Sequence, residues 1–273
     1  MAAKVKGTAR GPAGGEGPGK RTALITGASS GLGEQFARQL AAGGYDLVLA
    51  ARRKDRLDRL AAELAEQRGV ATEVLEVDLS TPAGVAAVEE RLRRGDIEML
   101  VNNAGFGTRG EFHALPPDRE LQEIDLNVRA LARLSHAALE SMVPARRGAI
   151  INVASLGAFQ PVPYMSTYGA TKAFVLHFSE GLYEEAKKHG VTVTCLCPGP
   201  VKTEFQQVAG VRAERMAVGW VPPEKVVAAA LKGARRGQAV VVPGGMNRLA
   251  AASVKFLPRF VARRIAGAMF REP

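Results

Sequence analysis

Residues 21–40 read RTALITGASSGLGEQFARQL. A short apolar stretch at residues 21–26 leads into a glycine-rich turn, and an amphipathic run follows it. The glycines of such a turn let the backbone approach a phosphate closely, and the start of the next helix supplies free N–H groups. At a first βα junction this order predicts a dinucleotide-binding α/β fold. We expect the turn to bind the cofactor through Gly27, Ser29, Ser30, Gly31, Leu32 and Gly33.

The rest of the chain continues the strand–helix alternation. Apolar runs alternate with helical patterns, which is typical of a parallel α/β sheet; the runs are residues 45–51, 70–77, 97–102, 149–154, 191–197 and 239–242. A chain of 273 residues can form one domain with a sizeable core. We therefore divide it into three parts. Residues 1–20, rich in glycine, are expected to be disordered; residues 21–245 form the dinucleotide-binding domain, and residues 246–273 form a helical extension.

A second informative pattern is Ser155-x12-Tyr168-x3-Lys172. On a helix, Tyr168 and Lys172 share one face because they are four residues apart. A phenol has a pKa of about 10. A neighbouring ammonium favours the phenolate, so we expect Lys172 to lower the pKa of Tyr168 toward the range useful for proton transfer. Ser155 ends an apolar run. The pattern predicts that these side chains protonate or deprotonate an oxygen atom, and that the carbon bonded to this oxygen accepts or donates a hydride.

The Tyr-x3-Lys spacing occurs a second time, at Tyr183 and Lys187. This copy has Ala170, not serine, thirteen residues before its tyrosine. We therefore interpret Tyr183 as a surface or packing residue.

The expected second strand, residues 45–51, ends without the Asp or Glu that an NAD site places there for the ribose 2′-hydroxyl. Arg52, Arg53 and Lys54 follow instead. A guanidinium suits bidentate phosphate binding, so Arg52 favours the 2′-phosphate of NADP. Arg53 and Lys54 fit a solvated helix start, an interpretation that stays open for Arg52 as well.

Together these residues resemble the classical short-chain dehydrogenase/reductase family over roughly residues 21–245. The resemblance is carried by Thr26-Gly27-x3-Gly31-x-Gly33, Asp78, Asn102-Asn103-Ala104-Gly105, Asn127, Ser155, Tyr168, Lys172 and Pro198-Gly199 with Thr203. It implies a single-domain, doubly wound parallel sheet of about seven strands. It also implies a catalytic set of Asn127, Ser155, Tyr168 and Lys172, in which Asn127 supports a water-linked proton relay.

The resemblance also implies contacts to the cofactor. Asp78 would contact the adenine, Asn103 would lie near the adenosine ribose, and Lys172 would hold the nicotinamide ribose. The implied site further includes Ala104, Gly105, Tyr168, Pro198, Gly199, Val201 and Thr203. Many NADP-type members carry a second basic residue in the glycine turn, where this chain has Ser29 and Ser30. Cofactor choice therefore rests mainly on Arg52.

The net charge of +10 invites a nucleic-acid hypothesis, but the charge lies at the ends. With residues 1–20 and 246–273 set aside, 27 of 37 basic and 25 of 27 acidic residues remain. This balance argues against nucleic acid as a partner. The four histidines show no ligand spacing, so no metal is implied. We expect Cys195 and Cys197 to be buried, reduced and pointed to opposite faces of one strand.

The C-terminal extension has apolar residues at helical spacing beside a cationic face. The helix expected from Pro258 to Phe270 would be about 20 Å long at 1.5 Å per residue, too short to span a bilayer. Packing on the domain or on a second subunit is the interpretation we favour. Docking on an anionic membrane is the alternative.

The sequence thus predicts an NADP(H)-dependent oxidoreductase that interconverts a carbonyl and an alcohol on a mostly hydrophobic small molecule. The alternative is a noncatalytic NADP-binding sensor, against which the intact Asn-Ser-Tyr-Lys set argues. We expect a homodimer or homotetramer. We also expect a cytoplasmic location, because no secretory signal is visible in residues 1–20.

Overall fold

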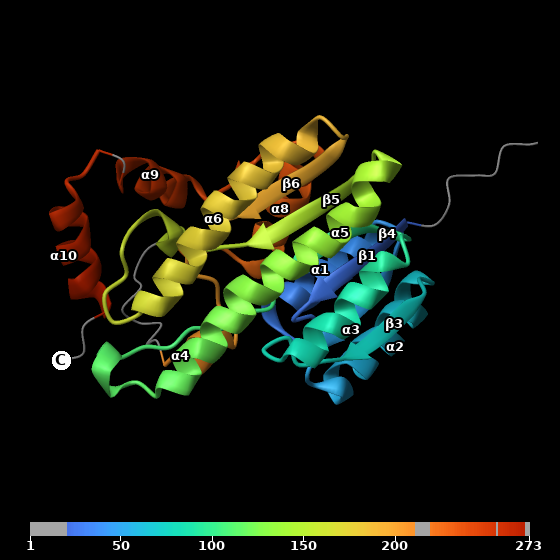
Figure 1. Ribbon diagram of the computed structural model, residues 1–273, viewed down its shortest axis with the longest axis horizontal. Helices are drawn as coiled ribbons and strands as arrows, with labels where there is room; N and C mark the ends of the chain where they lie inside the picture. Colours follow the sequence, from blue (N-terminus) through green and yellow to red (C-terminus); the bar gives the residue numbers. More distant parts are fainter. Residues whose placement is uncertain (1–20, 211–218, 255, 271–273) are drawn as a thin grey trace, which may run out of the picture.

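The computed structural model describes residues 21–210, 219–254 and 256–270 and has the predicted parallel α/β architecture (Figure 1). Seven strands form one sheet in the order β3-β2-β1-β4-β5-β6-β7, and all neighbouring strands are parallel. The disorder expected for residues 1–20 lies outside the described residues. The strands are β1 (Arg21–Thr26), β2 (Tyr45–Ala51), β3 (Thr72–Glu76), β4 (Ile97–Asn102), β5 (Gly148–Val153), β6 (Val191–Leu196) and β7 (Val240–Val241).

Helices connect the strands, as the alternation of patterns predicts. They are α1 (Gly31–Ala42), α2 (Lys54–Arg68), α3 (Pro82–Arg93), α4 (Pro117–Ile124), α5 (Leu131–Ala145), α6 (Ser166–Lys187), α7 (Phe205–Val208) and α8 (Pro223–Arg235). Helices α9 (Gly245–Val254) and α10 (Arg259–Phe270) follow the last strand and form the predicted C-terminal helical extension. A π-helical turn, Asp125–Ala130, joins α4 to α5, and short 3-10 turns occur at Phe112–Ala114 and Leu156–Phe159. Among the helices in the described ranges, none combines the length and hydrophobicity that a membrane span requires.

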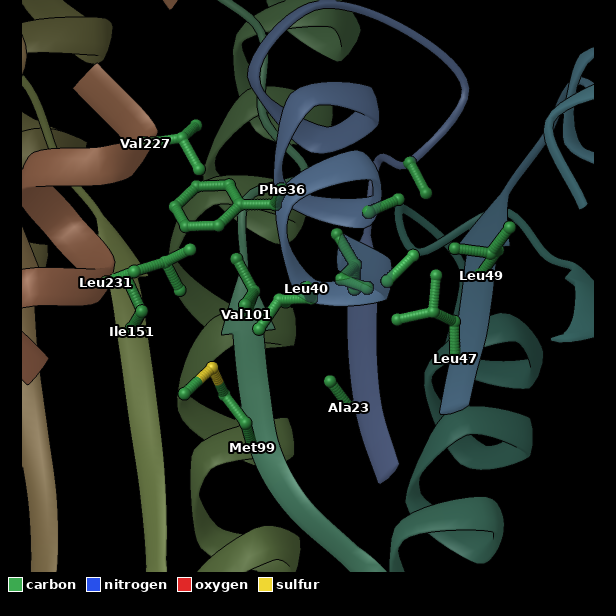
Figure 2. Packing of buried hydrophobic residues seen from close by; sticks show 14 of the residues in the cluster. Ala23, Phe36, Leu40, Leu47, Leu49, Met99, Val101, Ile151, Val227 and Leu231 are labelled. Atoms are coloured by element: carbon green, nitrogen blue, oxygen red, sulfur yellow. The ribbon is translucent and has the colours of Figure 1, made fainter. Parts of the chain in front are cut away.

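Two hydrophobic layers cover the two faces of the sheet. Helices α1, α2 and α8 pack on one face, and α3, α5 and α6 pack on the other. Strand β1 shows why: Ala23 and Ile25 belong to the first layer, and Leu24 between them belongs to the second, because successive side chains of a strand point to opposite faces. Figure 2 shows the first layer, where Phe36 of α1 and Val227 of α8 lie over the central strands.

The strand order determines where a ligand site can form. From β1 the chain proceeds to β2 and β3 on one side, and from β4 it proceeds to β5, β6 and β7 on the other. Because the strands are parallel, the loops after β1, β4 and β5 all leave at the same edge. Ligands of doubly wound sheets bind at this edge, beside the point where the order reverses.

The two cysteines are buried and free, as expected. The expectation that their side chains point to opposite faces was wrong. Residues two apart on a strand share a face, and Cys195 Sγ lies 3.7 Å from Cys197 Sγ.

Candidate active site

The glycine-rich turn joins β1 to α1 in a conformation that requires glycine. Gly27 has φ 65° and Gly31 has φ 57°, both in the left-handed region. A Cβ atom on Gly33 would lie 2.2 Å from the carbonyl oxygen of Gly27. The turn therefore folds tightly over the start of α1. Ser30, which precedes that helix, makes no side-chain capping hydrogen bond to it.

Asn103, at the end of β4, holds this turn in place. Its side-chain nitrogen donates to the carbonyl of Thr26 at 2.9 Å and to that of Gly27 at 3.3 Å. The backbone N–H groups of Asn103 and Ala104 both donate to Thr26 Oγ1. The resemblance predicted a ribose-side role for Asn103, and the structure places it directly against the turn that would hold the phosphates.

The end of β2 carries the residues expected to select the cofactor. Arg52 is exposed, with 67% of its side chain accessible, and its Nη1 lies 3.9 Å from Asp78 Oδ2. Asp78 also accepts hydrogen bonds from the backbone N–H and hydroxyl of Ser80. Arg52 and Asp78, which the sequence assigned to the 2′-phosphate and the adenine, thus lie next to each other.

The interpretation of Arg53 as part of a solvated helix start was wrong. Its guanidinium donates to Ser29 Oγ at 3.2 Å, to Ser30 Oγ at 2.7 Å and to Glu204 Oε2 at 2.8 Å. Arg53 is therefore the basic residue at the glycine turn that the local sequence lacked. Arg53 follows β2 and contacts the turn from there. The residue spacing within the turn could therefore not reveal this contact.

Glu204 links the loop after β6 to Arg53 and Arg56, which follow β2. It accepts hydrogen bonds from Arg56 at 2.6 Å and from Arg53, and these bonds hold the pKa of its carboxyl at about 2. The neighbouring Thr203 lies beside the glycine turn, since a Cβ atom on Gly31 would be 3.3 Å from Thr203 Cβ. The loop after β6 therefore folds back onto the nucleotide end of the site.

The same loop also contacts the opposite end of the site. The backbone N–H of Leu156, next to Ser155, donates to the carbonyl of Pro198 at 2.7 Å. A Cβ atom on Gly199 would lie 2.5 Å from Asn247 Nδ2, so α9 packs tightly against this glycine. The loop that carries Pro198, Gly199, Val201 and Thr203 thus spans from the Ser155 segment to the glycine turn.

Ser155, Tyr168 and Lys172 come together at the carboxyl edge of β5. The Ser155 hydroxyl lies close enough to Tyr168 to favour its phenolate form, and Ser155 Oγ accepts a hydrogen bond from the N–H of Gly157 at 3.1 Å. Lys172 Nζ donates to the carbonyl of Val153 at 2.8 Å and lies 5.8 Å from the centre of the Tyr168 ring. The predicted grouping is present, with two members on α6 and the third at the end of β5.

The protonation state of Tyr168 is determined mainly by burial of its hydroxyl and not by the charge of Lys172. Burial raises the pKa of Tyr168 to about 12, although the neighbouring Ser155 side chain opposes the rise. Burial also lowers the pKa of Lys172 to about 8. The expected lowering of the tyrosine pKa by Lys172 was therefore wrong, because the ammonium is directed to Val153 and the phenol is desolvated. Tyr168 is held in its neutral form, as a proton donor requires.

Asn127 lies in the π-helical turn between α4 and α5 and is buried. π-helical turns inside helices frequently mark functional sites. Its side-chain nitrogen donates to the carbonyl of Phe106 at 2.9 Å and to Thr171 Oγ1 at 3.1 Å, and its Oδ1 accepts from the N–H of Phe106. A Cβ atom on Gly105 would lie 2.9 Å from Asn127 Oδ1 and 3.4 Å from Lys172 Nζ. Asn127 therefore fixes the loop after β4 against the lysine.

Two carboxylic acids near Tyr168 and Lys172 were not predicted from the sequence. Glu120 and Glu123 of α4 are 5% and 0% exposed. Glu123 Oε2 accepts from the N–H and hydroxyl of Thr108, both at 2.9 Å, and its Oε1 is buried without a partner among the described residues. Burial raises the pKa of Glu123 to about 7. Their spacing of three residues on one helix face was a signal, but nothing local showed that the face would be buried.

The second Tyr-x3-Lys copy is a packing element, in agreement with the sequence interpretation. Tyr183 packs against the core layer under α6, and its hydroxyl donates to the carbonyl of Gly237 at 3.0 Å.

Apolar side chains surround the Tyr168 ring. The Phe205 ring lies 5.3 Å from it, centre to centre, and Val162, Met165 and Ala209 complete this small cluster. A separate cavity of about 650 Å³ lies between the loops after β4 and β5 and helix α10. Phe112, Tyr164, His113 and Arg264 are among the residues that line this cavity.

Comparison with known proteins adds three matches. The family model described as short chain dehydrogenase matches residues 21–212. A short-chain dehydrogenase from Sphingobium yanoikuyae, solved in complex with NADPH, is 41% identical with a TM-score of 0.79, over 86% of this chain and 93% of that one. The bulky-bulky ketone specific alcohol dehydrogenase from Comamonas testosteroni is 35% identical with a TM-score of 0.74, over the same shares of both chains.

A curated relative, the very-long-chain 3-oxoacyl-CoA reductase of Anas platyrhynchos, is 32% identical over 195 residues. The match covers 68% of this chain and 62% of that protein. The chain spans about three fifths of the length of the curated relatives it matches.

Proposed function

This chain belongs to the short-chain dehydrogenase family, and we propose that it is an NADP(H)-dependent oxidoreductase that interconverts a carbonyl and an alcohol on a mostly hydrophobic substrate. The observation that carries the proposal is that Ser155, Tyr168 and Lys172 come together at the carboxyl edge of β5, with Lys172 Nζ 5.8 Å from the centre of the Tyr168 ring. This group stands at the edge of the sheet to which the glycine turn also belongs. Hydride transfer from the cofactor and proton transfer from Tyr168 can therefore occur at the same edge of the sheet.

The residues at the glycine turn fit a dinucleotide phosphate. A side chain at Gly33 would collide with the Gly27 carbonyl, so only glycine allows the turn to fold this tightly. The first backbone N–H groups of α1 lie at the same turn and can bind a phosphate. We assign the phosphates to residues 27–33 and the 2′-phosphate to Arg52, with Arg53 as a second cation. The NADPH-bound relative supports the same cofactor.

In the reduction direction the cofactor supplies the hydride. Tyr168 donates its hydroxyl proton to the substrate oxygen, and Ser155 donates a hydrogen bond to that oxygen. Lys172, whose pKa of about 8 lies near neutrality, holds a proton close to the tyrosine. Asn127 acts as a positioning residue, because both functions of its amide are already engaged with Phe106 and Thr171.

The walls around Tyr168 support an apolar substrate. Val162 and Met165 are buried beside the ring, and Phe205 packs on it. The ketone specificity named for the Comamonas testosteroni relative agrees with a bulky, hydrophobic carbonyl compound.

The proposal is tested by following NADPH absorbance across ketones, aldehydes and acyl thioesters of increasing chain length. We expect kcat/KM to rise with the apolar length of the substrate. The Tyr168→Phe variant serves as the blank. A protein that binds NADPH but oxidises it with none of these carbonyl compounds would instead support the noncatalytic sensor.

Cofactor preference gives a separate prediction. Arg52→Ala should weaken NADPH binding about ten- to a hundredfold more than NADH binding, since a charge-assisted hydrogen bond contributes roughly 1.5–3 kcal/mol. Dissociation constants for both cofactors measure this directly. Lys54→Ala is the matched control, because that exposed lysine pairs with Asp58. Equal affinity of the unmodified protein for the two cofactors would contradict the assignment.

A further inference from the structure

The C-terminal helices leave large apolar side chains facing solvent. Ten such side chains are exposed in the described structure, and six of them lie between residues 246 and 265. We call these six the C-terminal face: Met246, Leu249, Phe256, Leu257, Phe260 and Ile265. Phe256 is the most exposed of them, at 87%. In Figure 1, α9 and α10 lie together at one end of the molecule.

Helix α10 is attached to the protein through its small residues instead. Ala262 and Ala266 are 3% and 0% exposed. Gly267 lies against Pro163, since a Cβ atom added to Gly267 would be 3.6 Å from Pro163 Cγ. Phe260 and Ile265 remain 53% and 51% exposed. Packing on the domain, one part of the interpretation favoured from the sequence, is therefore seen for Ala262 and Ala266 but not for Phe260 and Ile265. Large apolar side chains left exposed along one short segment are typical of an interaction site.

The charge of the same segment restricts what can cover it. Residues 245–270 contain Arg248, Lys255, Arg259, Arg263 and Arg264 and no acidic residue. The four arginines are exposed. Within the part of the chain that the structure describes, none of them forms an ion pair with a carboxylate. The partner must therefore accept both apolar side chains and a concentrated positive charge.

We infer that the C-terminal face docks on an anionic lipid surface, with α10 lying in the plane of the interface. A helix of 12 residues, about 18 Å long, suits this placement and is too short to cross the bilayer. Amphipathic helices with basic flanks insert their apolar side chains at the headgroup boundary while the cations contact acidic lipid.

A second copy of the chain is the less suitable occupant. A twofold interface places the same patch opposite itself, so the basic residues of both copies would come together without any carboxylate from these helices. Like charges set against each other in an interface disfavour the association. Anionic headgroups neutralise the same residues. The inference goes beyond the proposed catalytic function and does not depend on it.

The test uses the full-length protein in vesicle co-sedimentation. Vesicles of phosphatidylcholine alone are compared with vesicles containing about one third phosphatidylglycerol. We expect binding to the anionic vesicles only, and weaker binding as salt is raised, because exposed charges are screened. The double variant Phe256→Ser/Phe260→Ser should lose at least about tenfold in binding, and Arg259→Glu/Arg263→Glu should lose binding as well.

Control variants separate this face from the rest of the surface. Phe174→Ser removes an exposed aromatic side chain of α6, and Lys187→Glu/Lys188→Glu reverses basic residues at the end of that helix. Neither should change binding. The inference is overturned if the unmodified protein does not bind anionic vesicles, or if the face and control variants bind equally. It is also overturned if sedimentation shows that Phe256→Ser/Phe260→Ser dissociates an oligomer, since the face then joins copies of the chain.

Discussion

Replacing Tyr168 with phenylalanine is expected to lower kcat by about 10²- to 10⁴-fold, the usual contribution of a positioned proton donor. The affinity for NADPH should stay nearly unchanged, because the aromatic ring that packs against Phe205 remains. Only the hydroxyl, which lies near Ser155, is lost. Steady-state kinetics with the best carbonyl substrate, together with a cofactor titration, measure both quantities.

Tyr183→Phe is the matched control for this experiment. It removes the same atom from the other Tyr-x3-Lys copy and breaks one hydrogen bond, to the carbonyl of Gly237. Its effect should be confined to about 1 kcal/mol of folding stability, the usual net value of such a bond. Comparable losses of activity in two well-folded variants would refute the assignment of the catalytic tyrosine.

Glu123→Gln is expected to make the folding stability less dependent on pH. The pKa of Glu123 is raised by burial, from an ordinary 4.5 to about 7, with Glu120 adding to the rise and Thr108 and Lys172 opposing it. A group whose pKa is higher in the folded state stabilises the fold below its unfolded pKa. That stabilisation is lost as pH rises from about 5 through 7. At 1.36 kcal/mol per pKa unit, the loss is at most about 3 kcal/mol.

The measurement is the free energy of unfolding, from denaturant titrations at several values between pH 5 and pH 8. The wild type should lose stability over this range, and Glu123→Gln, whose amide stays neutral, should lose less. Glu185→Gln, on the exposed side of α6, is the control and should follow the wild type. Parallel profiles for the wild type and Glu123→Gln would show that the buried carboxyl does not titrate in this window.

Much of the fold was predictable because its signals are local. The apolar run at residues 45–51 matches β2, and the run at 97–102 matches β4. Gly27 and Gly31 have positive φ angles that other residues rarely adopt, so the turn was visible in the sequence. The pairing of Tyr168 with Lys172 follows from helix geometry alone, since residues four apart share a face.

Other parts of the site depend on contacts between distant segments. Arg53 was interpreted as solvated, yet it joins Ser29 and Ser30 to Glu204, which lies 151 residues away in the chain. No spacing rule connects these positions. Only the return of the loop after β6 to the glycine turn brings them together.

Burial was likewise decided by packing. The sequence showed a lysine beside a tyrosine and predicted a lowered pKa, but desolvation raised it and the lysine was directed to Val153. The same holds for Glu123 and for α10, where tertiary contacts bury a carboxyl and two alanines and leave Phe260 in solvent. A residue type and its spacing determine which groups share a helix face or end a strand. Which groups are removed from water, and which other groups then contact them, is determined only when the whole chain has packed.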